Sequence, residues 1–212
     1  MISIVTPTFP GREELLLERC IPSVRDQEFG HIQHIIVSDR NPKLREQIWL
    51  RGGGVTYVEI NESWRNAFSE SCTGAFPWSI GSILAMGEVI GFLGDDDEYM
   101  PHHVERHLQT MEETGADFTI SEVQFQVDGV PKFVVGDDSF QLGHLDSDGI
   151  MCKVHCLKSA NWSISDVDGN AADYRLVRDW LSAGLKGALV PGGPTAIHHD
   201  GWLAGKSGRP RE

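Results

Sequence analysis

The amino-acid sequence predicts an α/β fold in which a mostly parallel sheet is flanked by helices. Over roughly the first hundred residues, short apolar segments alternate with segments of helical periodicity, a pattern typical of parallel sheets. In the second half, Asp128-Gly129 stands between two apolar segments and predicts a short antiparallel hairpin. The 212 residues, 40% of them apolar and 23% charged, fit one domain spanning residues 1–212 with a substantial core.

Three strands are expected in the first sixty residues, because three apolar segments there are bounded by turn-forming residues. Helices are expected between them, and Pro22 should weaken the last turn of the first one. In chain order we expect a strand at 2–5, a helix at 13–24 with Leu16, Cys20 and Val24 on one face, a strand at 34–38, a short helix at 43–50 and a strand at 55–60.

The alternation continues to the middle of the chain and then changes. After a less regular stretch, Pro101 opens a helix, and Asp128-Gly129 joins the hairpin strands. Near the end, Gly184 should stop a helix. The expected elements are a helix at 78–86, a strand at 89–93, a helix from 101 with Val104, Leu108 and Met111 on one face, hairpin strands at 118–126 and 132–135, a helix at 173–183 with Val177 and Leu181 spaced for burial, and a strand at 188–190.

Charge and composition disfavour some classes of partner. The net charge of −13 should repel nucleic acid and anionic membranes, and the basic residues of the tail are expected to be solvated. No apolar run approaches the roughly 18 residues needed to span a bilayer. The first residues are too short and uncharged for a secretory signal, so a cytoplasmic location is expected.

The four cysteines predict neither a disulfide framework nor a zinc site. Their spacing in a chain of this length is not that of a disulfide-rich domain. Cys152 and Cys156 flank His155, but no second ligand pair with zinc-finger spacing accompanies them. We expect buried thiols at a passage from a strand to a helix.

The sharpest chemical feature is Asp95-Asp96-Asp97, which follows the apolar strand at 89–93 and Gly94. Adjacent carboxylates repel one another, so they need either a cation or exposure to water. Ligands of open α/β sheets bind beyond the carboxyl ends of the strands, where this triplet stands. Carboxylate oxygens suit Mg²⁺ or Mn²⁺, which in turn suit a diphosphate. A solvated acidic loop is the alternative.

Other polar residues indicate a binding site only in combination with the triplet. Asp39 ends the second strand and is expected on the same edge of a parallel sheet, unless it only forms a turn. His198 and His199 offer metal ligands or are surface residues. The segments 146–149 and 166–170 are interpreted as turns, because neither has the glycine and glutamate positions of a calcium loop.

Segments spread over the chain, taken in order, resemble family 2 glycosyltransferases of the GT-A type. The first two strands resemble that family's opening and its base-contacting aspartate. The strand before the triplet resembles its metal-binding Asp-x-Asp strand, and two later segments resemble its Glu-Asp segment and late histidine. The residues concerned are Ile4 to Phe9, Arg12, Ser23-Val24, Gln27, His34 to Asp39, Ala85 to Asp97, Pro101, Ala172-Asp173-Tyr174, Arg178-Asp179-Trp180 and Ile197-His198-His199.

This resemblance implies inverting transfer of a sugar from a nucleoside diphosphate sugar, often a uridine one, to an acceptor hydroxyl. It implies a nucleotide-sugar and metal-binding half at 1–100 and an acceptor-binding half at 101–212, with Mn²⁺ or Mg²⁺ as the cofactor. The implied residues are Thr6, Thr8, Arg12, Asp39, Ser79 and Asp95 at the nucleotide-sugar, Asp96, Asp97 and His198 (or His199) at the metal, and Asp173 as the catalytic base.

Three positions depart from the family pattern and keep alternatives open. Gly94 stands in place of the first aspartate of the motif, Ala172 in place of the glutamate before the base, and Ser79 in place of an asparagine. A catalytically inactive module that binds a sugar-nucleotide or glycan is therefore one alternative. A nucleotidyltransferase is another, although its glycine-rich basic loop is reduced here to Pro10-Gly11-Arg12. The acceptor is not identified by the sequence.

Overall fold

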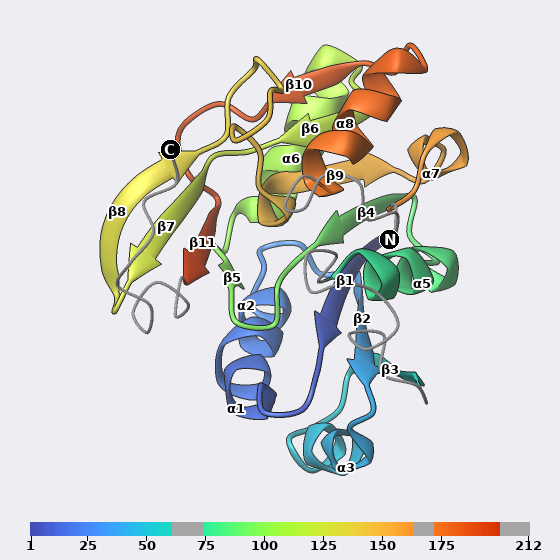
Figure 1. The fold of residues 1–212 in the computed structure, drawn as a ribbon, viewed down its shortest axis with the longest axis vertical. Coiled ribbons are helices and arrows are strands. Elements are labelled where there is room, and N and C mark those ends of the chain that lie inside the picture. The colour runs from blue at the N-terminus through green and yellow to red at the C-terminus, as the bar shows by residue number, and fades with distance from the viewer. Residues whose placement is uncertain (61–73, 163–171, 200–212) are drawn as a thin grey trace.

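A computed structural model describes residues 1–60, 74–162 and 172–199 and confirms the predicted α/β class. A seven-stranded sheet has the order β10-β6-β9-β4-β1-β2-β3, and a four-stranded sheet, β5-β11-β7-β8, lies beside it (Figure 1). The strands are β1 (Ile2–Thr8), β2 (Ile32–Asp39), β3 (Val55–Ile60), β4 (Val89–Phe92), β5 (Glu98–Tyr99), β6 (Phe118–Ile120), β7 (Val123–Val127), β8 (Val130–Val135), β9 (Ile150–Lys153), β10 (Gly187–Leu189) and β11 (Ala196–His199).

Helices cover both faces of the main sheet. The first expected helix is continuous but contains a π-helical turn, η1 (Leu16–Cys20), between α1 (Glu13–Leu15) and α2 (Ile21–Arg25). The others are α3 (Pro42–Leu50), α5 (Ala75–Leu84), α6 (His103–Thr114), a 3-10 turn η3 (Ser147–Gly149), α7 (Cys156–Ser159) and α8 (Ala172–Ser182). One apolar cluster joins η1, α2, α3 and α6 to one face of the sheet, and a second joins α5, α7 and α8 to the other.

Four neighbouring strands, β4, β1, β2 and β3, are parallel, as the alternation predicted. The apolar residues of β4 and β1 are buried, as expected of a sheet covered by helices on both faces. Thr8 at the end of β1 pairs with Ser38, and Asp39 follows at the end of β2. The carboxyl ends of these strands therefore form one edge, and the acidic triplet begins shortly after β4 ends.

Strand β9 is the main feature of the large sheet that the sequence pattern did not predict. It lies between β4 and β6 and runs antiparallel to both, with Gly91 opposite Met151. Because it runs backwards, its amino end lies beside the carboxyl end of β4. The turn η3 just before β9 is thereby brought to the edge that carries the triplet.

The second sheet contains the predicted hairpin. Strands β7 and β8 are antiparallel, and the turn residues Asp128 and Gly129 have φ values of 51° and 73°, the left-handed conformation that such turns favour. Strand β11, which the sequence pattern did not predict, pairs in parallel with β7 and places His198 opposite Phe125. Its other neighbour is β5, which follows the triplet directly.

The expectation of one strand at 118–126 is wrong, because the segment contains two strands. Its first part, β6, belongs to the seven-stranded sheet, whereas β7 belongs to the four-stranded one. The chain passes from one sheet to the other between Ile120 and Val123. At this passage the Thr195 hydroxyl donates a hydrogen bond to the Ser121 hydroxyl at 2.7 Å. Apolar residues on both sides of this passage make it look continuous in the sequence.

Two helix faces can be compared with their predictions. In α6, Val104 and Met111 are buried, as expected. In α8, Val177 is buried, but the expectation that Leu181 is buried is wrong, since it is 39% exposed. Leu176 and Trp180 complete the buried face of α8, because the helix turns this side toward the second apolar cluster.

The thiols of the second half lie where the sequence predicted them. Cys152 belongs to β9 and Cys156 begins α7, and both are buried free thiols at a passage from a strand to a helix. His155 bonds the Asp117 carboxylate at 2.9 Å. Among the helices of the described ranges, none has the length and apolar character needed to cross a membrane.

Candidate functional site

The three carboxylates of the triplet have different partners. Asp95 is buried, its Oδ2 accepts the Thr8 hydroxyl at 2.8 Å, and its Oδ1 lies 3.6 Å from the Arg12 guanidinium. Burial raises the pKa of Asp95 to about 7, and the charge of Asp96 adds to the rise while Arg12 and Thr8 oppose it. The end of β1, the loop after it and the triplet thus form one polar edge.

Asp96 is the most accessible of the three, with 26% of its side chain exposed. Its carboxylate forms an ion pair with Arg12, and its backbone carbonyl accepts the Arg19 guanidinium at 2.6 Å. Burial alone would lower the pKa of Arg12, but the charges of Asp96 and Asp95 raise it. Arg12 is therefore a fixed positive charge beside the exposed side of the triplet.

Asp97 is the inward member. It is 3% exposed, and its Oδ1 accepts the backbone N–H of His199 at 2.7 Å. Its Oδ2 lies 3.5 Å from His198 Nδ1. Burial raises the pKa of Asp97 well above its usual range, and the charge of Asp148 adds to this while His198 opposes it.

The turn η3 brings two further carboxylates to this inner region. Asp146 caps the turn by accepting the Asp148 N–H at 3.0 Å, and Asp148 Oδ1 accepts the Gly94 N–H at 2.9 Å. Asp146 Oδ2 and Asp148 Oδ2 lie 3.5 and 3.4 Å from His198 Nδ1. We call Asp97, Asp146, Asp148 and His198 the inner cluster.

His198 is the basic member of the inner cluster. Its ring stacks on Phe125, with 4.3 Å between the centroids, and this contact helps to fix the ring orientation. Burial by itself would lower the pKa of His198, but Asp97, Asp146 and Asp148 raise it to about 11. Ligand atoms of Asp97, Asp148 and His198 all lie within 4.8 Å of one another, close enough to share a metal ion.

The contacts of the two adjacent histidines differ. His199 Nε2 bonds Glu98 Oε1 at 2.8 Å, whereas His198 Nδ1 faces the carboxylates of the inner cluster. Alternate residues of a strand point to opposite faces, so one histidine of the pair turns toward the cluster and the other turns away. The geometry favours His198 over His199 as a metal ligand.

Packing explains why position 94 holds glycine and not the aspartate that the resemblance implies. A Cβ atom at this position would lie 2.4 Å from Asp97 Oδ2, so any side chain would displace that carboxylate. The Gly94 N–H also binds Asp148. The departure from the family pattern is therefore coupled to the inward position of Asp97.

The predicted nucleotide-sugar residues are only partly brought together. Asp39 is buried at the end of β2, on the same edge as Asp95. Ser79 is half-buried on α5, which packs on β1 and β2. Thr6 lies deeper, where its hydroxyl and His34 Nε2 are 2.9 Å apart, so it belongs to the interior of the sheet rather than to its edge.

Asp173 stands in the first turn of α8 and is half-buried. Its Oδ1 accepts the backbone N–H of Tyr174 at 2.7 Å. Burial raises the pKa of Asp173 to about 6, and the charge of Asp148 contributes to the rise. Asp173 therefore lies within electrostatic reach of the inner cluster, although it is far from the triplet in sequence.

Sequence reasoning missed the place of Asp146 and Asp148 in this arrangement. The segment 146–149 is a turn, as predicted, but its carboxylates face His198 and the triplet. Two aspartates on either side of one serine, just before an apolar segment, were the available signal. Their proximity to Asp97 depends on the antiparallel position of β9. The other predicted turn, 166–170, lies outside the described residues.

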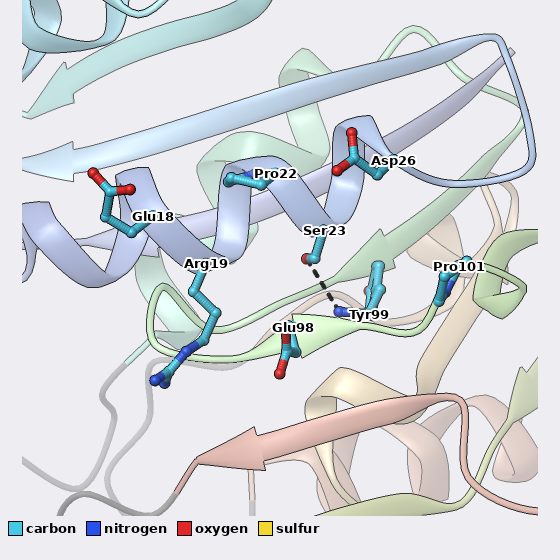
Figure 2. A pocket seen from close by; sticks show the side chains of 8 residues that line it. All are labelled: Glu18, Arg19, Pro22, Ser23, Asp26, Glu98, Tyr99 and Pro101. Atoms are coloured by element: carbon cyan, nitrogen blue, oxygen red, sulfur yellow. Dashed lines mark hydrogen bonds between the residues drawn. The ribbon is translucent and has the colours of Figure 1, made fainter. Parts of the chain in front are cut away.

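A groove of about 400 Å³ lies between the first helix and β5. Figure 2 shows its lining, which includes Arg19 and Glu98 and in which the Ser23 hydroxyl accepts the Tyr99 N–H at 3.1 Å. Its lining includes no residue of the triplet or of the inner cluster. The groove is therefore a neighbour of the candidate site and not the site itself.

Comparison with known proteins supports the resemblance seen in the sequence. Residues 3–145 match the family described as "Glycosyl transferase family 2". A curated relative from Bacillus subtilis (strain 168), "Putative teichuronic acid biosynthesis glycosyltransferase TuaG", is 27% identical over 143 residues. That match covers 66% of this chain and 54% of TuaG, so the chain spans about half the length of this relative.

Solved structures share the fold at low sequence identity. S. aureus TarS 1–349 matches with a TM-score of 0.70 and 12% identity, over 93% of this chain and 60% of that one. The same fragment in complex with UDP matches with a TM-score of 0.69 and 14% identity, over the same shares of the two chains. Mannosyltransferase PcManGT from Pyrobaculum calidifontis, in complex with GDP-Man and Mn²⁺, matches with a TM-score of 0.69 and 12% identity, over 96% and 59%.

Proposed function

Because the chain belongs to glycosyltransferase family 2, we propose that it moves a sugar from a nucleoside diphosphate sugar to an acceptor hydroxyl with inversion. The observation that carries this proposal is the shared edge of β1, β2 and β4, where Asp39 ends β2 and where Arg12 pairs with Asp95 and Asp96. This edge offers both acceptors for a nucleoside and charges for a diphosphate. Residues 101–212 are proposed to bind the acceptor.

A uridine donor is the more specific proposal. TarS 1–349 has been determined in complex with UDP, whereas PcManGT holds GDP-Man, so the fold accommodates more than one base. A buried carboxylate at Asp39 would accept the ring N–H of uracil, as the resemblance implies. Asp95, held by Thr8, would accept a ribose hydroxyl.

The candidate site also fits a divalent cation, Mn²⁺ or Mg²⁺. Buried carboxylates face one another there, and His198 Nδ1 has no hydrogen-bond partner in the described parts of the chain. Asp96, Asp97 and His198 are the residues proposed to hold the ion. When bound, the ion would supply positive charge to the diphosphate as it leaves. Arg12 stands beside Asp96 and would add to that charge.

The remaining chemical task is to remove a proton from the acceptor hydroxyl. We assign it to Asp173, whose carboxylate lies at the start of α8 within electrostatic reach of the inner cluster. A carboxylate positioned on the acceptor side would take the proton as the oxygen attacks the sugar carbon from the face opposite the diphosphate. The resemblance also assigns Thr6 and Ser79 to the nucleotide-sugar. Because Thr6 lies in the interior, it would affect the donor only indirectly, by positioning strand β1.

The proposed function is tested by ligand-dependent stability. Nucleoside diphosphates and nucleotide-sugars are screened by thermal shift, each with Mn²⁺ and with chelator. A donor present at about 100 times its dissociation constant should add about 2.7 kcal/mol to the free energy of unfolding. No stabilisation by any nucleotide-sugar would contradict the proposal.

An inactive binding module is the second candidate, because Ala172 and Gly94 depart from the family pattern. Such a module would bind the same donors without turning them over. The two candidates are separated by donor hydrolysis in the absence of acceptor, since an active transferase also transfers slowly to water. Release of nucleoside diphosphate above the uncatalysed rate favours the enzyme.

For Asp39→Ala, we expect uridine nucleotides to bind more weakly by about 1–3 kcal/mol, because a hydrogen bond to a buried charged group is lost. Isothermal titration calorimetry with UDP measures the effect. The control is Asp26→Ala, which removes an exposed carboxylate just after α2. If GDP binds the wild-type protein better than UDP does, the uridine assignment is wrong.

The rate of transfer should depend on pH through Asp173. A general base must be deprotonated to work, and its pKa of about 6 means that the active form is lost as the pH falls below that value. We expect the rate at saturating donor and Mn²⁺ to be half-maximal near pH 6 and to level off above it. Donor binding measured over the same range is the control, and a rate that stays constant down to about pH 5 would contradict the assignment.

A further inference from the structure

The spacing within the inner cluster is unusual for hydrogen bonds. His198 Nδ1 lies 3.5, 3.5 and 3.4 Å from carboxylate oxygens of Asp97, Asp146 and Asp148. Hydrogen bonds between nitrogen and oxygen are usually about 2.7–3.2 Å long. Two ligand atoms that each lie about 2.1 Å from one metal ion are instead roughly 3.0–3.5 Å apart. The three distances from His198 Nδ1 are therefore those expected between ligands of one ion, and the ligand atoms of Asp97, Asp148 and His198 all lie within 4.8 Å of one another.

Asp148 carries the second, independent observation. The residue is 1% exposed, and its Oδ2 has no hydrogen-bond partner within the described ranges. Its other oxygen is occupied by the Gly94 N–H, which aims Oδ2 at His198. Buried polar atoms are normally paired, so an unpaired carboxylate oxygen in this position indicates a cation as its partner.

We propose that Asp148, with Asp97 and His198, forms a preformed metal site that binds a divalent ion before the nucleotide arrives, with release of the His198 proton to solvent. The inference rests on the proposed function in one respect only, which is that the bound ion would act on the diphosphate of the donor. It differs from the pattern-based assignment, because the third ligand comes from the turn before β9 and not from the triplet. Asp96 is engaged by Arg12 and would meet the ion only from the exposed side.

The ligand set also indicates which ion the site would prefer. An imidazole nitrogen beside carboxylate oxygens suits first-row transition ions, whereas Mg²⁺ prefers oxygen ligands and water. Because three protein ligands are already in place, the ion does not need a diphosphate to complete its binding. We therefore expect the nucleotide-free protein to bind Mn²⁺ more tightly than Mg²⁺.

The competing explanation is that a protonated His198 alone balances the carboxylates. In that case the cluster is an internal ion-pair network and gains little from an added ion. The two explanations predict different results for Mn²⁺ added to the protein without nucleotide. The difference is measurable without any catalytic assay.

The experiment titrates the nucleotide-free protein with Mn²⁺ and follows the signal of free Mn²⁺ by electron paramagnetic resonance. We expect one site in the wild-type protein and at least a tenfold weaker one in Asp148→Asn. Asparagine keeps an oxygen for the Gly94 N–H, so the local fold should persist, and thermal melting checks this. Asp137→Asn removes an exposed carboxylate that also faces a histidine, His144, and should leave Mn²⁺ binding unchanged.

Two outcomes would overturn the inference: no Mn²⁺ site in the nucleotide-free wild-type protein, or equal affinity in Asp148→Asn. If Asp148→Asn does not fold, His198→Gln serves as the second variant and should show the same loss. UDP binding is measured separately on the same preparations. If UDP binds but no preformed Mn²⁺ site is found, the proposed function is retained and the metal-site inference is rejected. If Mn²⁺ binds but no nucleotide does, the metal site is retained and the proposed function is rejected.

Discussion

Asp173→Asn is expected to reduce sugar transfer by about 10²–10⁴-fold while donor binding stays nearly unchanged. The substitution keeps the shape of the side chain and removes the carboxylate that we propose accepts the proton. Asp173 is half-buried in the first turn of α8, and its surroundings favour the neutral form more than water does, as expected of a carboxyl group used as a base near neutral pH. Transfer or donor hydrolysis and calorimetric donor binding are measured on the same preparations.

A purely structural role for Asp173 predicts a different pattern. A carboxylate in the first turn of a helix stabilises the helix by about 0.3–1 kcal/mol, and its loss would leave turnover nearly intact. Asp179 lies on the same helix, is exposed and pairs with Arg178, so Asp179→Asn is the matched control. Near-normal transfer in Asp173→Asn would remove it from the mechanism. Asp168, the other carboxylate to compare, lies outside the described residues.

Asp96→Ala is expected to abolish the increase in nucleotide affinity that Mn²⁺ produces, while Mn²⁺ still binds to the inner ligands, and to reduce transfer by about 10²–10³-fold. Asp96 is the exposed carboxylate of the triplet, so it is the one able to face an ion shared with a diphosphate. The measurement compares UDP affinity with Mn²⁺ and with chelator, in the wild-type protein and in the variant.

The control for this comparison is Asp26→Ala, which removes an exposed carboxylate paired with Arg25. It should keep the full effect of Mn²⁺. If the wild-type protein binds UDP equally well with Mn²⁺ and with chelator, the metal linkage itself is refuted. If Mn²⁺ still increases the UDP affinity of Asp96→Ala, the ion is held without Asp96. The inner ligands alone would then be enough to hold the ion beside the diphosphate.

Local sequence was sufficient for most of the secondary structure of the first half. The parallel strands follow from apolar runs that end in turns, and the Asp128-Gly129 hairpin follows from the conformations these residues favour. The predicted burial of Leu181 is wrong, because spacing along a helix defines several overlapping stripes. Packing against the second apolar cluster selects the stripe that contains Leu176 and Trp180.

The position of the triplet was also predictable, since a carboxylate run after a buried strand must lie at the edge of the sheet. The contacts that distinguish its members were not. Arg12 on Asp96, Thr8 on Asp95 and the His199 backbone on Asp97 all join residues distant in sequence. The sequence pattern treats the three aspartates as equivalent, whereas the fold makes one partly exposed and two buried.

The sequence by itself determined the α/β class, the edge that carries the acidic triplet and the resemblance to one family, because these depend on local periodicity and on motifs within single segments. The tertiary structure alone decided which groups surround Asp97. Strand β9 runs antiparallel between β4 and β6 and carries Asp148 to the triplet, and β11 joins the second sheet and carries His198 there. Such pairings are set by the packing of whole layers, which leaves no local signature in the residues that it brings together.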